Sequence, residues 1–228
     1  MARQDVWIGQ NFFAGTAAVS RACLKKSRHG VALDWLFGER DHDVLTSQGF
    51  RLYMDVVCSL ACNALAWFGI QCSSFVQICV SVSCRGLDND WLGDEDKDFV
   101  RTGNLMMILS TLLMLVAHLL KVEVLLEQPV TSVMPLCPTM KNVLSFIGMT
   151  RSVTYLGAFG GPSVKPIQVF HNHVKYQALV RERPMMLAAR ELVARSESGQ
   201  YTSIPDALEQ SGAYPLDFAQ ALADIWRP

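Results

Sequence analysis

The sequence lacks an excess of either charge, since 20 Lys and Arg residues against 21 Asp and Glu residues leave a net charge of −1. It therefore has no global basic field of the kind that drives nonspecific nucleic-acid binding, and such a partner would need a local patch. Charged residues make up 18% and hydrophobic residues 50% of the 228 positions, which excludes disordered and low-complexity classes. This composition predicts a sizeable buried core.

A secretion signal and a disulfide framework are also missing. Residues 1–7 carry an acid and no long apolar core, unlike a signal peptide. The seven cysteines, an odd number, are not arranged as in a short secreted disulfide scaffold. We expect reduced cysteines in an intracellular protein, nuclear or cytoplasmic and not secreted.

Metal-ligand spacing is absent as well. The cysteines between residues 58 and 84 lack the paired close spacing of a structural zinc site, and no histidine lies among them. His171 and His173 are two apart on an expected strand without a third ligand nearby, so we interpret them as surface or pocket polar residues. The sequence predicts no bound metal.

The most apolar segment, residues 105–120, stops short of the about 20 residues that span a bilayer. It also contains Ser110, Thr111 and His118, so we interpret it as a buried helix and consider a membrane unlikely. The mean hydropathy of +0.21 is moderately high. A small protein anchored in a membrane through this segment is therefore kept as an alternative hypothesis.

Short apolar runs alternate with helical patterns along the first two-thirds of the chain. The expected strands are residues 6–13, 30–35, 64–70, 122–126 and 153–159. The expected helices are residues 17–26, 48–62, 99–120 and 133–147. This alternation predicts an α/β fold with a mostly parallel sheet and helices on both faces.

Two units are expected along the chain. Residues 1–175 hold the alternating pattern and should form the α/β domain. Residues 176–228 read as a charged helical extension, in which Phe218, Leu222 and Trp226 are spaced four apart. This apolar stripe predicts a helix that packs on the α/β domain.

In an open parallel sheet, ligands bind beyond the carboxyl ends of the strands, so the residues there are the candidates for a site. A turn of small residues around Gly15 follows the first expected strand and would let the backbone approach a cofactor. Asp34 ends the second strand, 19 residues after Gly15, a spacing at which a carboxylate accepts hydrogen bonds from ribose hydroxyls. Asp43 supplies a further acid, and either acid is equally explained as a helix cap or a surface residue.

Two later strands end in residues that suit covalent catalysis. Cys72 follows the strand at 64–70 and precedes Ser73 and Ser74, a position that can expose a nucleophile, although a small core cysteine is the common alternative. Glu127 ends the next strand, where burial of its charge is costly unless it has a partner or a role. A glycine-rich turn at 157–162 is then followed by Lys165.

Taken in order, these motifs resemble the cytosine-C5 DNA methyltransferases. The resemblance lies in residues 13–16, 69–75 and 127–129, and residues 160–166 are similar to a turn of the phage-type members. It covers residues 6–175 and implies a Rossmann-like sheet of the kind found in S-adenosylmethionine-dependent methyltransferases. It also implies that Phe13, Gly15 and Thr16 surround S-adenosylmethionine, with Asp34 on the ribose and Asp43 near the adenine.

The same resemblance implies the catalytic roles. Cys72 would attack cytosine C6 as a thiolate, and Glu127 would hold the base and stabilise it while C5 takes the methyl group. Ser73, Ser74 and Lys165 would contact the substrate, with Lys165 on a phosphate or supporting the loop. The implied partner is nucleic acid, with DNA favoured, and the target base must leave the helix stack.

A catalytically degenerate binding module with the same fold is the alternative hypothesis. Thr16-Ala17-Ala18 stands where the family has another glycine, and Gln71 stands where proline usually precedes the nucleophile. The chain after Lys165 is also short for a typical target-recognition domain. These departures leave the fold expected and catalysis open.

Overall fold

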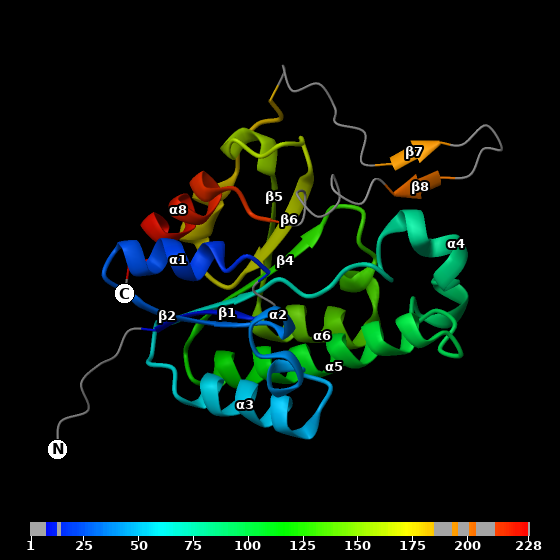
Figure 1. Cartoon of the computed structure of the whole chain (residues 1–228), viewed down its shortest axis with the longest axis horizontal. Coiled ribbons are helices and arrows are strands. Elements are labelled where there is room, and N and C mark those ends of the chain that lie inside the picture. Colours follow the sequence, from blue (N-terminus) through cyan, green and yellow to red (C-terminus); the bar gives the residue numbers. More distant parts are fainter. Residues whose placement is uncertain (1–7, 13–14, 185–192, 196–200, 204–212, 228) are drawn as a thin grey trace.

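The computed structural model describes residues 8–12, 15–184, 193–195, 201–203 and 213–227. Its main feature is a six-stranded sheet with the strand order β2-β1-β3-β4-β6-β5 (Figure 1). The strands in chain order are β1 (Ile8–Phe12), β2 (His29–Leu33), β3 (Leu65–Phe68), β4 (Glu123–Pro129), β5 (Thr150–Tyr155) and β6 (Pro166–His171). The expected α/β class is confirmed.

The sheet is mixed, so the prediction of a mostly parallel sheet was wrong. Strands β1 to β4 pair in parallel, whereas β6 pairs antiparallel with both β4 and β5. The reason lies in the connection between β5 and β6, which is a turn containing the 3-10 helix η5 (Leu156–Phe159) and no crossover helix. A short connection returns the chain beside the strand it has just left, and the two strands must then run in opposite directions.

Helices cover both faces of the sheet. Helices α3, α5 and α6 lie on one face, and α1 and α8 lie on the other (Figure 1). The longer helices are α1 (Ala18–Lys25), α3 (Ser47–Cys58), α5 (Asp98–Leu119), α6 (Pro138–Ile147) and α8 (Leu216–Ile225). Shorter turns are α2 (Trp35–Gly38), η1 (Glu39–His42), η2 (Gln77–Cys79), α4 (Val80–Ser83), η3 (Leu87–Asn89), η4 (Met134–Leu136) and η6 (Val174–Leu179).

The central strand β3 shows why the sequence gives this layering. Ala66 and Phe68 pack into the core under α3, α5 and α6, while Leu65 and Trp67 pack into the core under α1 and α8. All four side chains are fully buried. Successive side chains of a strand point to opposite faces, so a strand covered on both faces has a continuous apolar run.

The C-terminal segment packs on the α1 face of the sheet. Trp226 is fully buried and donates from its indole nitrogen to the carbonyl of Asn63 at 3.0 Å. Arg28 donates to the carbonyls of Ala223 and Trp226, which ties α8 to the end of α1. The expected helical extension is only partly helical, since β7 (Val193–Arg195) and β8 (Tyr201–Ser203) form an antiparallel pair within it.

Helix α5 is the one helix in the described part of the chain that is long and apolar enough to cross a membrane, judged by length and composition alone. One side of it, including Met107 and Leu113, is fully buried in the core. Its polar residues Ser110 and Thr111 donate to carbonyls of their own helix, at 2.7 and 2.6 Å. The other side exposes Leu105, Ile108, Leu112 and Leu119.

Candidate functional site

The strand order locates a natural binding position in the sheet. From β1 the chain moves outward to β2 and then crosses back to β3 on the other side of β1. The carboxyl ends of β1 and β3 therefore diverge at a topological switch point, which is where open α/β sheets bind ligands. The residues after β1, β2, β3 and β4 all lie at this edge of the sheet.

The turn after β1 is tied to the end of β2 by Asp34. The backbone N–H of Gly15, whose φ is +50°, donates to Asp34 Oδ2 at 2.9 Å. The second oxygen, Oδ1, accepts from the N–H of Leu36 at 2.9 Å and caps α2. Thr16 is exposed, and Phe13 lies outside the described residues. Asp34 thus supports the turn in which the sequence predicted a cofactor.

Ala17 lies in the Thr16-Ala17-Ala18 segment, where the resemblance expects another glycine. It is the N-cap of α1, its φ is +54°, and it makes no side-chain cap. This left-handed conformation is the one that glycine adopts without steric cost. The backbone of this turn therefore has a conformation that suits glycine, although the residue there is alanine.

The second expected cofactor residue, Asp43, lies near Asp34. Its Oδ1 accepts from the N–H of Leu45 at 3.0 Å. Burial first, and then the negative charges of Asp34 and Asp43, raise the pKa of Tyr53 on α3. The Tyr53 ring packs against Phe12 at the end of β1, with 5.5 Å between ring centroids. The structure thus brings both acids to the same side chain beside the switch point.

Cys72 and Glu127 come together at the ends of β3 and β4, two neighbouring strands. Cys72 is half-buried, and its carbonyl accepts from the N–H groups of Phe75 and Val76, which fixes the loop. Burial raises the pKa of the Cys72 thiol to about 11, the charge of Glu127 adds to the rise, and Lys165 opposes it. The resting cysteine is therefore a thiol near neutral pH.

Glu127 is the most unusual polar group at this edge. Its side chain is 7% exposed, and only one of its oxygens has a partner: Oε2 accepts from the Tyr214 hydroxyl at 2.6 Å. The other oxygen, Oε1, is buried and has no hydrogen-bond partner among the described residues. Burial raises the pKa of Glu127, although Lys165 and Tyr214 both act to lower it. A buried acceptor without a partner costs free energy, so the position of Glu127 calls for an explanation beyond folding.

The antiparallel direction of β6 places Lys165 in this group. Lys165 immediately precedes β6, and Ile167 pairs with Pro129 at the end of β4. Had β6 run parallel to β4, the residue before it would lie at the opposite edge. Lys165 acts electrostatically on both Cys72 and Glu127, so it supplies the positive charge of the site.

Tyr214 is a site residue that sequence reasoning missed. It lies 87 residues after Glu127, and its ring meets Trp67 edge-on, with centroids 5.4 Å apart. Its neighbour Pro215 lies against Gly161, where an added Cβ would fall 3.0 Å from Pro215 and 2.8 Å from the carbonyl oxygen of Leu156. The glycine turn therefore admits the C-terminal segment, a contact that no local pattern reveals.

The two serines after Cys72 have different positions. Ser73 is exposed, whereas Ser74 is buried and its hydroxyl accepts from the guanidinium of Arg85 at 2.9 Å. Arg85 is 2% exposed, also donates to the Ser74 carbonyl at 2.8 Å, and lies over the Phe75 ring at 3.7 Å. Ser74 is thus engaged with a buried cation that fixes the Cys72 loop. Sequence analysis missed Arg85, because folding brings it to partners 11 and 19 residues away in the chain.

Metal and histidine positions complete the description. Within the described residues, no group of three or more His, Cys, Asp or Glu side chains gathers as a metal site. His171 is buried on β6 with Nε2 2.9 Å from the Ser152 hydroxyl, and β6 ends there. His173 lies beyond the strand and is exposed, so the two histidines do not share a strand face.

Comparisons of the chain with protein-family models, with curated proteins and with solved structures find no match. The site therefore has to be interpreted from its own chemistry. It combines a thiol, a buried carboxyl group with a raised pKa, a lysine and a tyrosine at adjacent strand ends. Such a set can provide a nucleophile, a proton and a hydrogen-bonding surface for a planar polar substrate.

Proposed function

We propose that this protein transfers a methyl group from S-adenosylmethionine to C5 of cytosine in a nucleic acid, with DNA as the favoured substrate. The proposal rests on the proximity of Cys72 to Glu127 at the edge of the sheet that contains the switch point. The carboxyl group of Glu127 is buried, and only one of its oxygens has a hydrogen-bond partner among the described residues. A nucleophile beside an acid with a raised pKa is the arrangement expected for covalent activation of a ring.

The residues around the switch point fit the cofactor. No described residue beyond its chain neighbours lies within 4 Å of the Cβ position of Gly15, which favours the approach of a ligand to its backbone. Each oxygen of Asp34 accepts one backbone bond and retains a further acceptor site for a ribose hydroxyl. Thr16 and Asp43 lie at the same edge and would complete the cofactor contacts. S-adenosylmethionine, when bound, supplies an electrophilic methyl group.

The chain's own residues would perform the remaining chemistry. Cytosine C5 is a poor nucleophile, and addition of the Cys72 thiolate to C6 makes it enamine-like. Because its pKa is raised, Glu127 holds a proton to higher pH than an exposed glutamate and can donate it towards N3 of the base. Loss of that negative charge also removes one cause of the high Cys72 pKa. After C5 has taken the methyl group and lost its proton, the thiolate leaves C6.

Covalent trapping tests this proposal. A cytosine with fluorine at C5 cannot lose a C5 proton, so the Cys72–C6 bond would persist after methyl transfer. The full chain is incubated with S-adenosylmethionine and an oligonucleotide containing 5-fluorocytosine, and intact mass is measured. We expect a covalent complex that Cys72→Ala abolishes and Cys79→Ala, at the half-buried cysteine of η2, retains. A folded chain that forms no adduct with DNA or RNA refutes the catalytic proposal.

A second candidate is a module of the same fold that binds nucleic acid without catalysis. Two observations favour it: Ala17 places a methyl group on the left-handed turn, and Cys72 rests as a protonated thiol. This function predicts oligonucleotide binding without a covalent adduct and without S-adenosylmethionine binding in calorimetry. The trapping experiment and the calorimetry together separate the two functions.

A further inference from the structure

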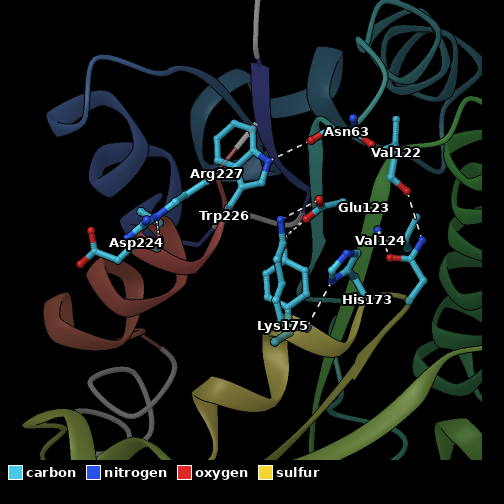
Figure 2. Close-up of polar contacts among 12 residues, drawn as sticks. Asn63, Val122, Glu123, Val124, His173, Lys175, Asp224, Trp226 and Arg227 are labelled. Atoms are coloured by element: carbon cyan, nitrogen blue, oxygen red, sulfur yellow. Dashed lines mark hydrogen bonds and ion pairs between the residues drawn. The ribbon is translucent and has the colours of Figure 1, made fainter.

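A second site lies at the opposite edge of the sheet from Cys72 and Glu127. A cavity of about 540 Å³ opens where β3 and β4 begin, and Figure 2 shows polar contacts that involve several residues of its lining, among them Glu123, His173 and Lys175. Glu123 at this edge is four residues before Glu127 on β4, so about 13 Å of strand separates them. The cavity is therefore distinct from the candidate catalytic site.

The cavity has a positive charge. Lys121, Lys175 and Arg227 line it, and Glu123 is the one carboxylate in its lining. Both oxygens of Glu123 are already used, since Oε1 accepts from Lys175 Nζ at 2.7 Å and Oε2 accepts from the Tyr176 hydroxyl. Lys121 Nζ and the terminal nitrogens of Arg227 make no hydrogen bond or ion pair to any residue that the structure describes. Arg227 also donates from Nε to the Asp224 carbonyl at 3.3 Å and attracts the Asp224 carboxylate, so Lys121 and the terminal N–H groups of Arg227 are the donors left for a ligand.

His173 adds a neutral donor to the same cavity. Its Nδ1 accepts from the backbone N–H of Lys175 at 3.2 Å, so this nitrogen carries no proton. In a neutral imidazole the proton must then be on Nε2. Figure 2 shows His173 beside Lys175. The cavity therefore presents an N–H donor as well as its cations.

The walls are held by hydrogen bonds between segments far apart in the chain. Asn172 accepts from the N–H of Val124 at 3.0 Å and donates to the carbonyl of Val122 at 3.1 Å, which fixes the start of β4 (Figure 2). The indole nitrogen of Trp226 donates to the Asn63 carbonyl at 3.0 Å and so ties the chain just before Arg227 to the segment before β3. The backbone on two sides of the cavity is thus fixed before a ligand arrives, which lowers the entropic cost of binding.

We propose that this cavity binds a small phosphomonoester. A dianionic phosphate accepts several charge-assisted hydrogen bonds, and the cavity provides an Arg fork, a Lys ammonium and an imidazole N–H from three separate segments. Its volume lies within the range of small-molecule sites and leaves room for an organic group beyond the phosphate. The carboxylate of Glu123, already paired, does not compete for Lys121 or Arg227.

Calorimetry on the full chain at low ionic strength tests this proposal, with inorganic phosphate and glycerol 3-phosphate as probes and glycerol as the uncharged control. We expect both phosphates to bind, glycerol not to bind, and added salt to weaken binding. Lys121→Gln and Arg227→Gln should each weaken binding about tenfold, because each removes a charge-assisted hydrogen bond. Lys141→Gln, on the exposed surface of α6, is the matched control and should bind as the original protein does.

Three results would overturn the proposal. The first is the absence of binding at millimolar phosphate, and the second is unchanged affinity in both cavity variants. The third is tight binding of an oligonucleotide without a terminal phosphate that displaces glycerol 3-phosphate, since that would indicate a nucleic-acid backbone as the ligand. None of these outcomes depends on Cys72, so the test is independent of the methyltransferase proposal.

Discussion

Replacing Tyr214 with phenylalanine isolates the one hydrogen bond that the buried Glu127 makes. The Tyr214 hydroxyl donates to Glu127 Oε2 at 2.6 Å, and no described residue bonds to Oε1. The phenylalanine ring would keep the edge-on contact with Trp67. Tyr214→Phe therefore leaves packing in place and leaves the carboxyl group without any hydrogen bond.

The expected cost follows from the charge state of Glu127. A hydrogen bond to a charged group contributes about 1.5–3 kcal/mol and a neutral one about 1 kcal/mol. We expect Tyr214→Phe to lower the free energy of unfolding by about 2 kcal/mol where Glu127 is ionised, which for a chain of this size is about 4–8 °C in Tm. At acidic pH the cost should fall towards about 1 kcal/mol, because the carboxyl group is then protonated.

The sign of the pH dependence is fixed by the direction of the pKa shift. Burial raises the pKa of Glu127 in the folded chain, so the folded state binds its proton more tightly than the unfolded state does. The contribution of this group to stability is therefore highest below the unfolded pKa and is lost as pH rises through the folded pKa. Loss of the Tyr214 bond raises the folded pKa further and enlarges this loss.

Urea denaturation at acidic and mildly alkaline pH measures the effect. Tyr155→Phe is the matched control, since the Tyr155 side chain has no hydrogen bond in the described part of the structure, and it should leave stability unchanged. The double variant with Glu127→Gln should show a smaller cost of Tyr214→Phe than the single variant. An equal cost in both backgrounds, or a cost that does not change with pH, would refute the assignment of the bond to a buried carboxylate.

Three further variants test the turn, the packing and the thiol. Ser27 follows α1 with φ +56° and is exposed, so Ser27→Gly should stabilise the chain by about 1 kcal/mol in urea denaturation, whereas Ser27→Ala should give no gain. Gly103→Ala should lower the free energy of unfolding by about 1–3 kcal/mol, because the added Cβ would fall 2.4 Å from Ser74 Oγ. Alanine favours the helix more than glycine does, so a more stable variant would contradict this packing. Glu127→Gln should speed alkylation of Cys72 at mildly alkaline pH, because removal of the negative charge lowers the thiol pKa, and an unchanged rate by mass spectrometry would contradict their proximity.

Long, strongly patterned elements could be predicted from the sequence. The helix expected at 99–120 is α5 at Asp98–Leu119, and the strand expected at 64–70 contains β3 at Leu65–Phe68. Both are apolar runs bounded by polar residues, so burial on the sheet or in the core determines them. Their ends differ because hydrogen-bond pairing with neighbours, and not hydrophobicity, sets where a strand stops.

Strand direction could not be predicted in the same way. The segment expected as a strand at 153–159 divides into the end of β5 and the 3-10 turn η5, after which the chain returns as β6. Apolar alternation is the same for a strand running in either direction. The hairpin connection decides the direction, and with it the edge at which Lys165 and His173 lie.

The candidate site was accessible to sequence reasoning only where its residues follow neighbouring strands. Cys72 and Glu127 met that condition, because β3 and β4 are parallel and adjacent. Tyr214 and Arg85 did not, since each reaches its partners through long-range packing. A buried arginine held by carbonyls and a tyrosine from a distant segment before α8 leave no local signature in composition or spacing.

Two glutamates on β4 differ in how completely their oxygens are hydrogen-bonded. Glu123 and Glu127 are both buried, but Glu123 has Lys175 and Tyr176 on its two oxygens, whereas among the described residues Glu127 has only Tyr214, on one oxygen. A fully partnered carboxylate is explained by folding alone. An incompletely partnered one lowers stability, and such a cost is typical of sites kept for chemistry. The position of Glu127 beside Cys72 and the switch point therefore supports the proposal that this carboxyl group serves catalysis.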